Sequence, residues 1–413
     1  MKKGWIKGMA CFLVLALTAL FCVGCGGGGG GKVTITIGEI TDLTGPASAA
    51  AIWSHMTAVD MVRYWNDENI ISGVNLKLAT WDERFDPSRD MPGYDWLRER
   101  GADVIYSLVA NFCEALKPFA ERDKTVICSS GATSPMIEPP GWVFAFSPTY
   151  AMDIKTLLKW LSENDWDYSK GVPKLGLPGW NEPIEVDMNK AIEQYCQDYP
   201  GKFDYVGASL APVGSMMWYG QVQEMKDCDY VVLASGVYGS FVEQFQGAGY
   251  TAKLVGPMAV AAFRGLLVDT LGWESLLDGM ISTQVNPWWG EGDSYPFIKL
   301  AEGILHRYHS AGEADEIIYR GGCSYLGTGQ TLYAILEVLK TAVEEVGAQN
   351  FDGQAYYNAA LKYKLSSPVW KGYPQWGFSQ TKRCWQDDEV IYRWSAEAKD
   401  LVRLSDFVPL VTE

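Results

Sequence analysis

The sequence predicts an α/β protein built of two doubly wound lobes, each with a parallel sheet at its centre. From Val33 onward, short apolar runs with strand character alternate with amphipathic helical stretches, which requires a parallel sheet covered on both faces. This alternation occurs in two successive sets. The 413 residues suffice for two or three domains, and 48% hydrophobic against 20% charged residues is the balance of a folded chain.

The first set of strands is expected at residues 33–40, 74–82, 103–108, 125–129 and 143–147. Helical stretches lie between them, for example at residues 58–66 and 92–100. In the first of these stretches the apolar positions recur at helical spacing, as at Val59 and Val62, so we expect one buried face.

The second set follows a linking segment at residues 148–166. Its strands are expected at 174–177, 203–208, 230–234 and 253–255, with helices at 187–195, 219–225 and 241–248. A strand at 279–285, helices at 294–309 and 326–346, and a strand at 389–395 complete the chain. A helical block after the second set indicates a return to the first lobe, with several crossings and a cleft at the carboxyl ends of the strands.

The N-terminus is typical of a targeting segment. Lys2, Lys3 and Lys7 precede an apolar run at residues 9–23, which would span ~22 Å as a helix. That is too short for a stable membrane span, so we predict a signal peptide at residues 1–24. Gly24-Cys25 resembles a bacterial lipobox, although Cys22 stands where leucine is usual. Acylation of Cys25 is therefore expected, with ordinary cleavage nearby and a free Cys25 as the alternative.

The acylated cysteine and a glycine-rich tether would occupy residues 25–32. Glycines 26–31 and Lys32 also spell most of a phosphate loop, but Val33 replaces the required Ser or Thr and no strand precedes it. Cleavage would leave a charge of 31 − 50 = −19, because the 34 Lys and Arg lose three members. This acidity argues against nucleic acid and against electrostatic docking on anionic lipid.

Six cysteines remain beyond the predicted signal: Cys113, Cys128, Cys196, Cys228, Cys323 and Cys384. In an oxidising compartment they permit three disulfides, and Cys113–Cys128 and Cys196–Cys228 are plausible pairs. Buried unpaired thiols fit equally well. Their wide spacing does not predict a zinc site.

Catalytic chemistry is not predicted. His306 and His309 share a helix face, which we interpret as a solvated helix end. The carboxylates Asp82, Glu83 and Asp86 follow a strand and are interpreted as solvated, with calcium binding as the alternative. No catalytic residue, metal site or cofactor is expected.

Three segments carry a resemblance to a known family: residues 37–46, IGEITDLTGP; residues 81–87, WDERFDP; and residues 129–135, SSGATSP. In this order and spacing the chain resembles type I periplasmic binding proteins, in the leucine/isoleucine/valine-binding branch, over residues 33–394. The resemblance implies two lobes, residues 33–148 plus 287–372 and residues 149–286 plus 373–413, joined by crossover hinge strands. It further implies a monomeric, extracytoplasmic receptor that closes on a small molecule and delivers it to the permease and ATPase of an ABC importer.

The resemblance also assigns a ligand carboxylate to the loop Gly131, Ala132 and Thr133, with a second contact near Ala110 or Asn111. Met258 stands where the family has the acid that pairs with an amino acid's ammonium group. A buried ammonium without a counter-charge is costly, although Glu182 or Glu39 could substitute.

Aromatic side chains complete the predicted site. Trp53 is expected in a loop, Trp180 and Tyr238 follow strands of the second lobe, and Trp288 follows a crossover. Their rings could stack on an apolar ligand or could simply pack within the protein. The prediction is a carboxylate with an apolar or aromatic body. The alternatives are a branched-chain or other hydrophobic amino acid, or a ligand sensor of the same fold.

Overall fold

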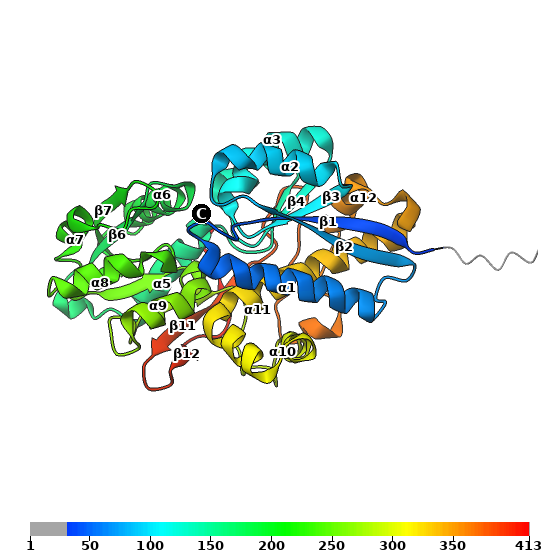
Figure 1. Cartoon of the computed structure of the whole chain (residues 1–413). Coiled ribbons are helices and arrows are strands. Elements are labelled where there is room, and N and C mark those ends of the chain that lie inside the picture. Colours follow the sequence, from blue (N-terminus) through cyan, green and yellow to red (C-terminus); the bar gives the residue numbers. More distant parts are fainter. Residues whose placement is uncertain (1–30, 413) are drawn as a thin grey trace, which may run out of the picture. The chain divides into compact units, whose positions relative to one another are not determined.

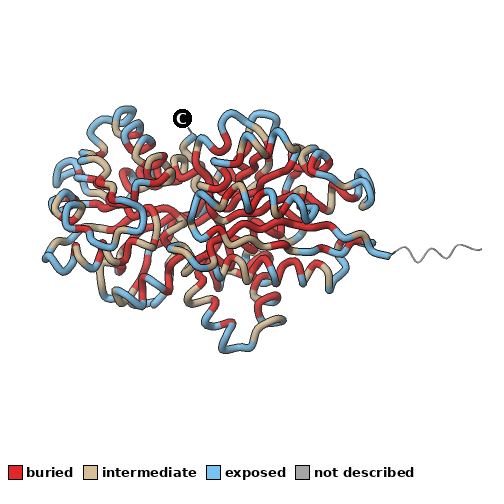
Figure 2. The backbone as a smooth tube through the Cα atoms, turned by 45° about the horizontal axis from the view of Figure 1, so that its top comes forward, coloured by how far each residue is buried: buried red, intermediate tan, exposed pale blue. Residues whose placement is uncertain are grey.

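A computed structural model describes residues 31–412; the predicted signal peptide and Cys25 lie outside the described residues. The first sheet has five parallel strands in the order β2-β1-β3-β4-β5 (Figure 1). They are β1 (Val33–Thr41), β2 (Val74–Asp82), β3 (Ala102–Ser107), β4 (Val126–Ser129) and β5 (Val143–Ala145). Strands β1, β3, β4 and β5 are buried over most of their length, which explains their largely apolar sequences (Figure 2). The edge strand β2 instead alternates buried and exposed residues over its first half.

Helices cover both faces of this sheet. In Figure 1, α2 (Asp90–Arg98) and α3 (Ala110–Asp123) lie on one side, and α1 (Ser48–Asp67) packs with α11 (Ala311–Val346) on the other. The remaining helices of this region are α4 (Ser134–Ile137), α10 (Pro296–Tyr308) and α12 (Gly353–Ala360). A capping box starts α11, since Ser310 and Glu313 satisfy each other's backbone N–H groups.

The second sheet runs β12-β11-β10-β9-β8-β6-β7, and β13 pairs with β11. Its parallel strands are β6 (Lys174–Trp180), β7 (Asp204–Ala211), β8 (Tyr230–Val232), β9 (Lys253–Gly256) and β10 (Ile281–Gln284). The C-terminal strands β11 (Asp388–Ser395), β12 (Asp400–Arg403) and β13 (Val408–Pro409) are antiparallel additions. The predicted parallel sheet of the second lobe is therefore confirmed for β6 to β10, and the C-terminal strands extend it with antiparallel pairing.

The helices of the second sheet are α5 (Tyr150–Asn164), α6 (Pro183–Asp198), α7 (Tyr219–Met225), α8 (Gly239–Gly247) and α9 (Arg264–Leu271). Short 3₁₀ segments occur at Pro87–Arg89, Tyr168–Lys170, Gly236–Tyr238, Met258–Phe263, Ala348–Asn350 and Pro368–Trp370. The segment at 148–166, expected to be a linker, is largely α5. Its start is fixed by Thr149, whose side chain accepts a hydrogen bond from the N–H of Met152.

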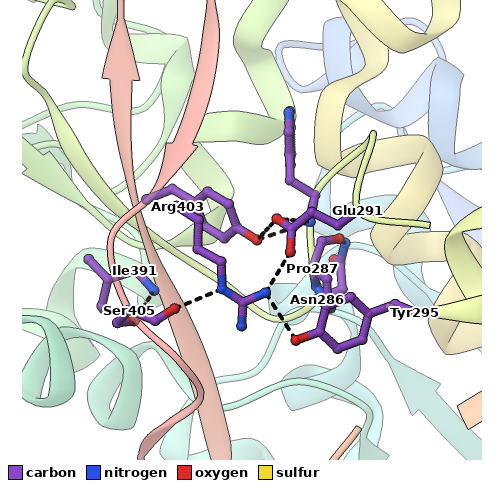
Figure 3. Close-up of polar contacts among 9 residues, drawn as sticks. Asn286, Pro287, Glu291, Tyr295, Ile391, Arg403 and Ser405 are labelled. Carbon is purple, nitrogen blue, oxygen red and sulfur yellow. Dashed lines mark hydrogen bonds and ion pairs between the residues drawn. The ribbon is translucent and has the colours of Figure 1, made fainter. Parts of the chain in front are cut away.

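The chain passes between the two sheets three times: from β5 to α5, from β10 to α10, and from α12 back to β11. On the last passage Cys384 forms a parallel bridge with Ala145. Polar contacts hold the second passage against the C-terminal strands (Figure 3). There Arg403 donates from Nη1 to Glu291 Oε2 at 2.5 Å and to the Tyr295 hydroxyl at 3.1 Å.

The two suggested disulfides are not formed, and all six cysteines of the described chain are free thiols. Cys113 and Cys128 lie on neighbouring elements, but each thiol has its own contact, with the Val109 carbonyl and the Tyr356 hydroxyl respectively. Burial raises the pKa of both thiols to about 12. Such thiols behave as small packing groups rather than as nucleophiles.

The interpretation of His309 as part of a solvated helix end was wrong. His306 is exposed, but the His309 Nε2 lies 2.7 Å from Asp60 Oδ2 on α1. This contact links the end of α10 to the helix beside it.

Candidate ligand-binding cleft

The carboxyl ends of strands from both sheets lead to one cavity, which together with the solvent space at its mouth measures about 940 Å³. Leu108 and Gly131 reach it from the first sheet, after β3 and β4. Trp180, Val237 and Met258 reach it from the second sheet, after β6, β8 and β9. The cavity therefore lies where open α/β sheets place their ligands.

Helix α11 closes one side of the cavity with small side chains. Ser324 and Thr328 lie one turn apart on the lining face, with Gly327 beside them. A Cβ on Gly327 would approach Asn286 Oδ1 to 3.3 Å, so a side chain here would crowd the neighbouring crossover. The helix thus contributes polar hydroxyls without filling the space.

Two features could receive an anionic group. The first-turn N–H groups of α3, which starts at Ala110, have no capping side chain, and such N–H groups attract anions. On the neighbouring loop, a Cβ on Gly131 would lie 3.0 Å from both the Leu108 carbonyl oxygen and the Tyr150 hydroxyl. The absence of a side chain at Gly131 therefore lets this loop approach Leu108 and Tyr150 closely.

An acidic group reaches the same cavity. Glu182 lines it and accepts a hydrogen bond from Asn111 Nδ2 at 3.1 Å. Behind it Glu185 is fully buried and accepts a hydrogen bond from the Tyr238 hydroxyl. Burial raises the pKa of both carboxyl groups, and in Glu185 the charge of Glu182 raises it further. We infer that the two carboxyls share a proton and present about one negative charge.

Glu39, the other acid considered as a counter-charge, does not line the cavity. Its Oε2 lies 2.7 Å from His55 Nδ1 and accepts a hydrogen bond from Thr80 at 2.8 Å. The hydrogen bond to Glu39 raises the pKa of His55. Of the two alternatives, only Glu182 meets the cavity, and none of the described residues that line it is Lys, Arg or His.

Four of the ten predicted site residues line this cavity: Ala110, Gly131, Trp180 and Met258. The indole of Trp180 is fixed in two ways. Its Nε1 donates to the Ser215 carbonyl at 3.0 Å, and its ring packs edge-on against Tyr238, with centroids 5.3 Å apart. Tyr238 therefore positions Trp180 and does not itself line the cavity.

The other predicted residues lie elsewhere. Thr133 donates its hydroxyl to Glu114 at 2.7 Å, and Ala132 is buried beneath the loop. Trp53 is in α1 rather than in a loop, against Gly321. Trp288 turns to the C-terminal strands, where its Nε1 donates to Asp400 at 2.8 Å. Asn111 faces a second cavity next to the first.

Several lining residues were not anticipated. Tyr150, Phe263 and the α11 side chains carry no local motif, because their position depends on how distant segments pack. The signal that did identify lining residues was the family resemblance, which pointed to Ala110, Gly131, Trp180 and Met258.

Within residues 31–412, no helix has the length and apolar character to cross a bilayer. The same residues contain no cluster of three or more His, Cys, Asp or Glu side chains arranged to hold a metal ion. The calcium alternative at Asp82, Glu83 and Asp86 therefore has no support.

Two sheet-centred units with a cavity at their carboxyl edges, crossed three times by the chain, define a bilobed solute-binding protein of type I. The sequence matches the model of the family described as periplasmic binding protein over residues 34–371. The chain belongs to this family. No curated protein sequence matches it.

Solved structures with the same fold include a branched-chain amino acid ABC transporter protein from Thermus thermophilus with bound valine. It is 14% identical, with a TM-score of 0.77, over 92% of this chain and 97% of that one. A fatty acid ABC transporter substrate-binding protein from Thermomonospora curvata is 14% identical, with a TM-score of 0.77, over 92% and 94% of the two chains. A solute-binding protein from Rhodopseudomonas palustris BisB5 in complex with 3,4-dihydroxybenzoic acid is 16% identical, with a TM-score of 0.73, over 92% and 98%. These likenesses support the fold and leave the ligand open.

Proposed function

We propose that the protein is the extracytoplasmic solute receptor of an ABC importer of the branched-chain-amino-acid type. The observation that carries the proposal is the largely apolar cavity between the carboxyl ends of the two sheets. A cavity of this character suits a small ligand with an apolar body. The protein would bind and release this ligand unchanged.

The ligand proposed first is a carboxylate with an apolar or aromatic body. The free N–H groups at the start of α3 and the open loop at Gly131 support an anionic head group, and Trp180 offers a ring face. A hydrophobic amino acid is the second candidate. It is favoured by Glu182, which supplies the acid that is missing at Met258.

The assignment of residues 33–148 plus 287–372 to one lobe and of residues 149–286 plus 373–413 to the other is part of this proposal. It is supported by the two separate sheets and the three passages between them. Ligand binding would draw the lobes together about these passages. Acylation of Cys25 would tether the receptor, as a monomer, to a bacterial membrane beside its permease.

Thermal unfolding of residues 32–413, which form one compact unit, tests the proposal. The panel contains branched-chain and aromatic amino acids, their deaminated acids and aromatic carboxylates. A ligand at 100 times its dissociation constant should stabilise the protein by ~2.7 kcal/mol. A shift with the acids alone supports the first candidate, a shift with amino acids supports the second, and no shift across the panel contradicts both.

A receptor that serves a signalling partner would give the same ligand response. Transport is distinguished by uptake of the identified ligand in cells that carry or lack this protein. Loss of uptake with loss of the protein is expected, and unchanged uptake would contradict the importer assignment.

A further inference from the structure

A second cavity of about 740 Å³ lies beside the first. Phe85, Val109 and Glu182 line both cavities, so the two spaces meet at these residues. The second cavity is bounded on one side by residues that follow β2 and β3, and on the other by residues that follow β6 and β7. It therefore bridges the same two sheets as the first.

The two cavities differ in charge. Glu83, Asp90 and Glu182 line the second cavity and are only 3%, 7% and 7% exposed. None of the described residues lining it is Lys, Arg or His. Three poorly solvated carboxyl groups around one space are an unfavourable arrangement unless a positive charge joins them.

Unsatisfied polar atoms give independent evidence that a partner is missing. Glu83 Oε2 accepts a hydrogen bond from the N–H of Asp86 at 3.1 Å, whereas its Oε1 is buried without a partner among the described residues. Asn111, on the wall of the same cavity, donates from Nδ2 to Glu182 while its Oδ1 is also buried and unpaired. Buried acceptors without donors are rare in native proteins and call for a donor from outside the chain.

The nearby cations of the same loop are engaged elsewhere. The Arg84 guanidinium lies 3.5 Å from Asp82, and Arg89 donates to the Asp82 backbone carbonyl at 3.0 and 3.1 Å. Arg89 also stacks over Trp81. Burial raises the pKa of Glu83 to about 7 and that of Asp90 to about 6, which is the response of carboxyls that lack a counter-charge.

Building on the proposed receptor function, we propose that the second cavity binds a cationic group of the ligand, an amine or a guanidinium, while the apolar body of that ligand fills the first cavity. The donors of such a group match the free acceptors of Glu83 and Asn111, and its charge offsets Asp90 and Glu182. Because these residues come from both sheets, the cationic group would be held from both sides of the cleft and would favour its closed state.

Calorimetry on residues 32–413 with matched probe pairs tests this inference. Each pair has one apolar body with and without a cationic end: hexanoate against 6-aminohexanoate, and 4-methylbenzoate against 4-guanidinobenzoate. We expect at least tenfold tighter binding of the cationic member at pH 8. The variants Glu83→Gln and Asp90→Asn should each reduce that preference severalfold. Asp95→Asn changes an exposed carboxyl on the same helix, α2, and should leave the preference unchanged.

A second measurement uses the unaltered protein and so does not depend on whether the variants fold. The preference for the cationic member should shrink at pH 5, where Glu83 and Asp90 are protonated. Equal or weaker binding of the cationic members, with clear binding of the uncharged-end members, would overturn the cationic site and leave the receptor function standing. No binding of any probe would count against both.

Discussion

Glu182 and Glu185 lie one helical turn apart at the start of α6, and both are buried. The Tyr238 hydroxyl contacts Glu185, and Asn111 contacts Glu182. No described cation accompanies them, so protonation of one carboxyl is the way to lower their repulsion. The negative charge left on the pair then faces the cavity through Glu182.

The change Glu185→Gln tests this shared proton. Since the pKa of Glu185 is raised well above 4.5 in the folded state, the folded protein binds more protons than the unfolded chain above that pH. Its contribution to stability is therefore present at low pH and is lost as the pH rises. We expect the variant to match the parent near pH 5 and to have a higher Tm at pH 8.

Glu193→Gln is the control for this variant, because Glu193 is exposed on the same helix. It should not alter the pH dependence of Tm. A lower Tm for Glu185→Gln at pH 8 would show that Glu185 is ionised and paired in the native protein.

At the scale of single residues, the family resemblance identified lining residues only where they end or closely follow a strand. This holds for Ala110, Gly131, Trp180 and Met258. Thr133 also follows a strand, but its side chain turns to Glu114. The direction of one side chain depends on local backbone angles and on neighbours that are distant in the chain.

At the scale of secondary structure, α11 is the element whose shape determines the cavity wall. Gly322 interrupts the helix with φ 44° and ψ −121°, immediately before the lining residues Cys323 and Ser324. A Cβ at this position would lie 2.6 Å from the Ala261 carbonyl oxygen. Both the backbone conformation and the close approach therefore require glycine.

The variant Gly322→Ala should destabilise the protein by about 2 kcal/mol or more, because the strained conformation adds to the steric contact. Urea unfolding measures the loss. Gly312→Ala is the matched control on the same helix, since a Cβ there meets nothing within 4 Å. It should leave stability unchanged or slightly raised. Equal stability of the two variants would refute the structural role of Gly322.

The start of α11 provides a second prediction at this scale. Ser310→Ala removes the side chain that accepts from the N–H of Glu313, and it should cost about 1 kcal/mol of unfolding free energy. Ser366→Ala changes an exposed serine outside any helix or strand and should have no effect in the same urea titration. A loss of similar size in both variants would mean that the capping box is not the cause.

The strands were predictable because apolar runs of strand length are bounded by turns, and the first eleven strands of the structure match the expected ones within a few residues at each end. The short strands β12 and β13 were missed, since they are brief and become strands by pairing with β11. Helix α5 was missed, since residues 148–166 were taken as a linking segment.

At the scale of the whole molecule, several of the many acidic residues are buried. Besides Glu83 and Asp90, Asp153 is buried where α5 meets β10, and burial raises its pKa to about 7. Thr283 donates to Asp153 at 2.5 Å, and burial together with the charge of Asp153 raises the pKa of the neighbouring Glu389. A chain rich in carboxylates thus folds with several of them protonated, which the formal charge of −16 does not reveal.

The direction in which stability changes with pH follows from the numbers of protons that the folded and unfolded states bind. The carboxyls with raised pKa bind protons in the folded state that the unfolded chain has released, so stability falls as the pH rises from about 4 to about 7. His55, whose pKa is raised by its hydrogen bond to Glu39, acts in the same direction as the pH rises above about 6.5. Asp82 and Asp123, whose pKa values are lowered, act oppositely and lose their contribution as the pH falls below 4. We therefore expect maximal stability at a pH of about 4.

Tm of residues 32–413 measured from pH 3 to pH 9 should show this maximum and a decline toward pH 8. For Asp153, a pKa moved from 3.8 to about 7 corresponds to at most about 4 kcal/mol. Asp153→Asn keeps an oxygen that can accept from Thr283 but cannot ionise, so it should flatten part of the decline, while Asp95→Asn should not. A Tm that rises from pH 5 to pH 8 in the parent would contradict the protonated interior.

A cationic ligand supplies the missing counter-charge at Glu83 and Asp90, so the stabilisation it gives should be larger at pH 8 than at pH 5. The protein with an empty cleft would then be least stable at high pH, and ligand binding would raise its stability most there.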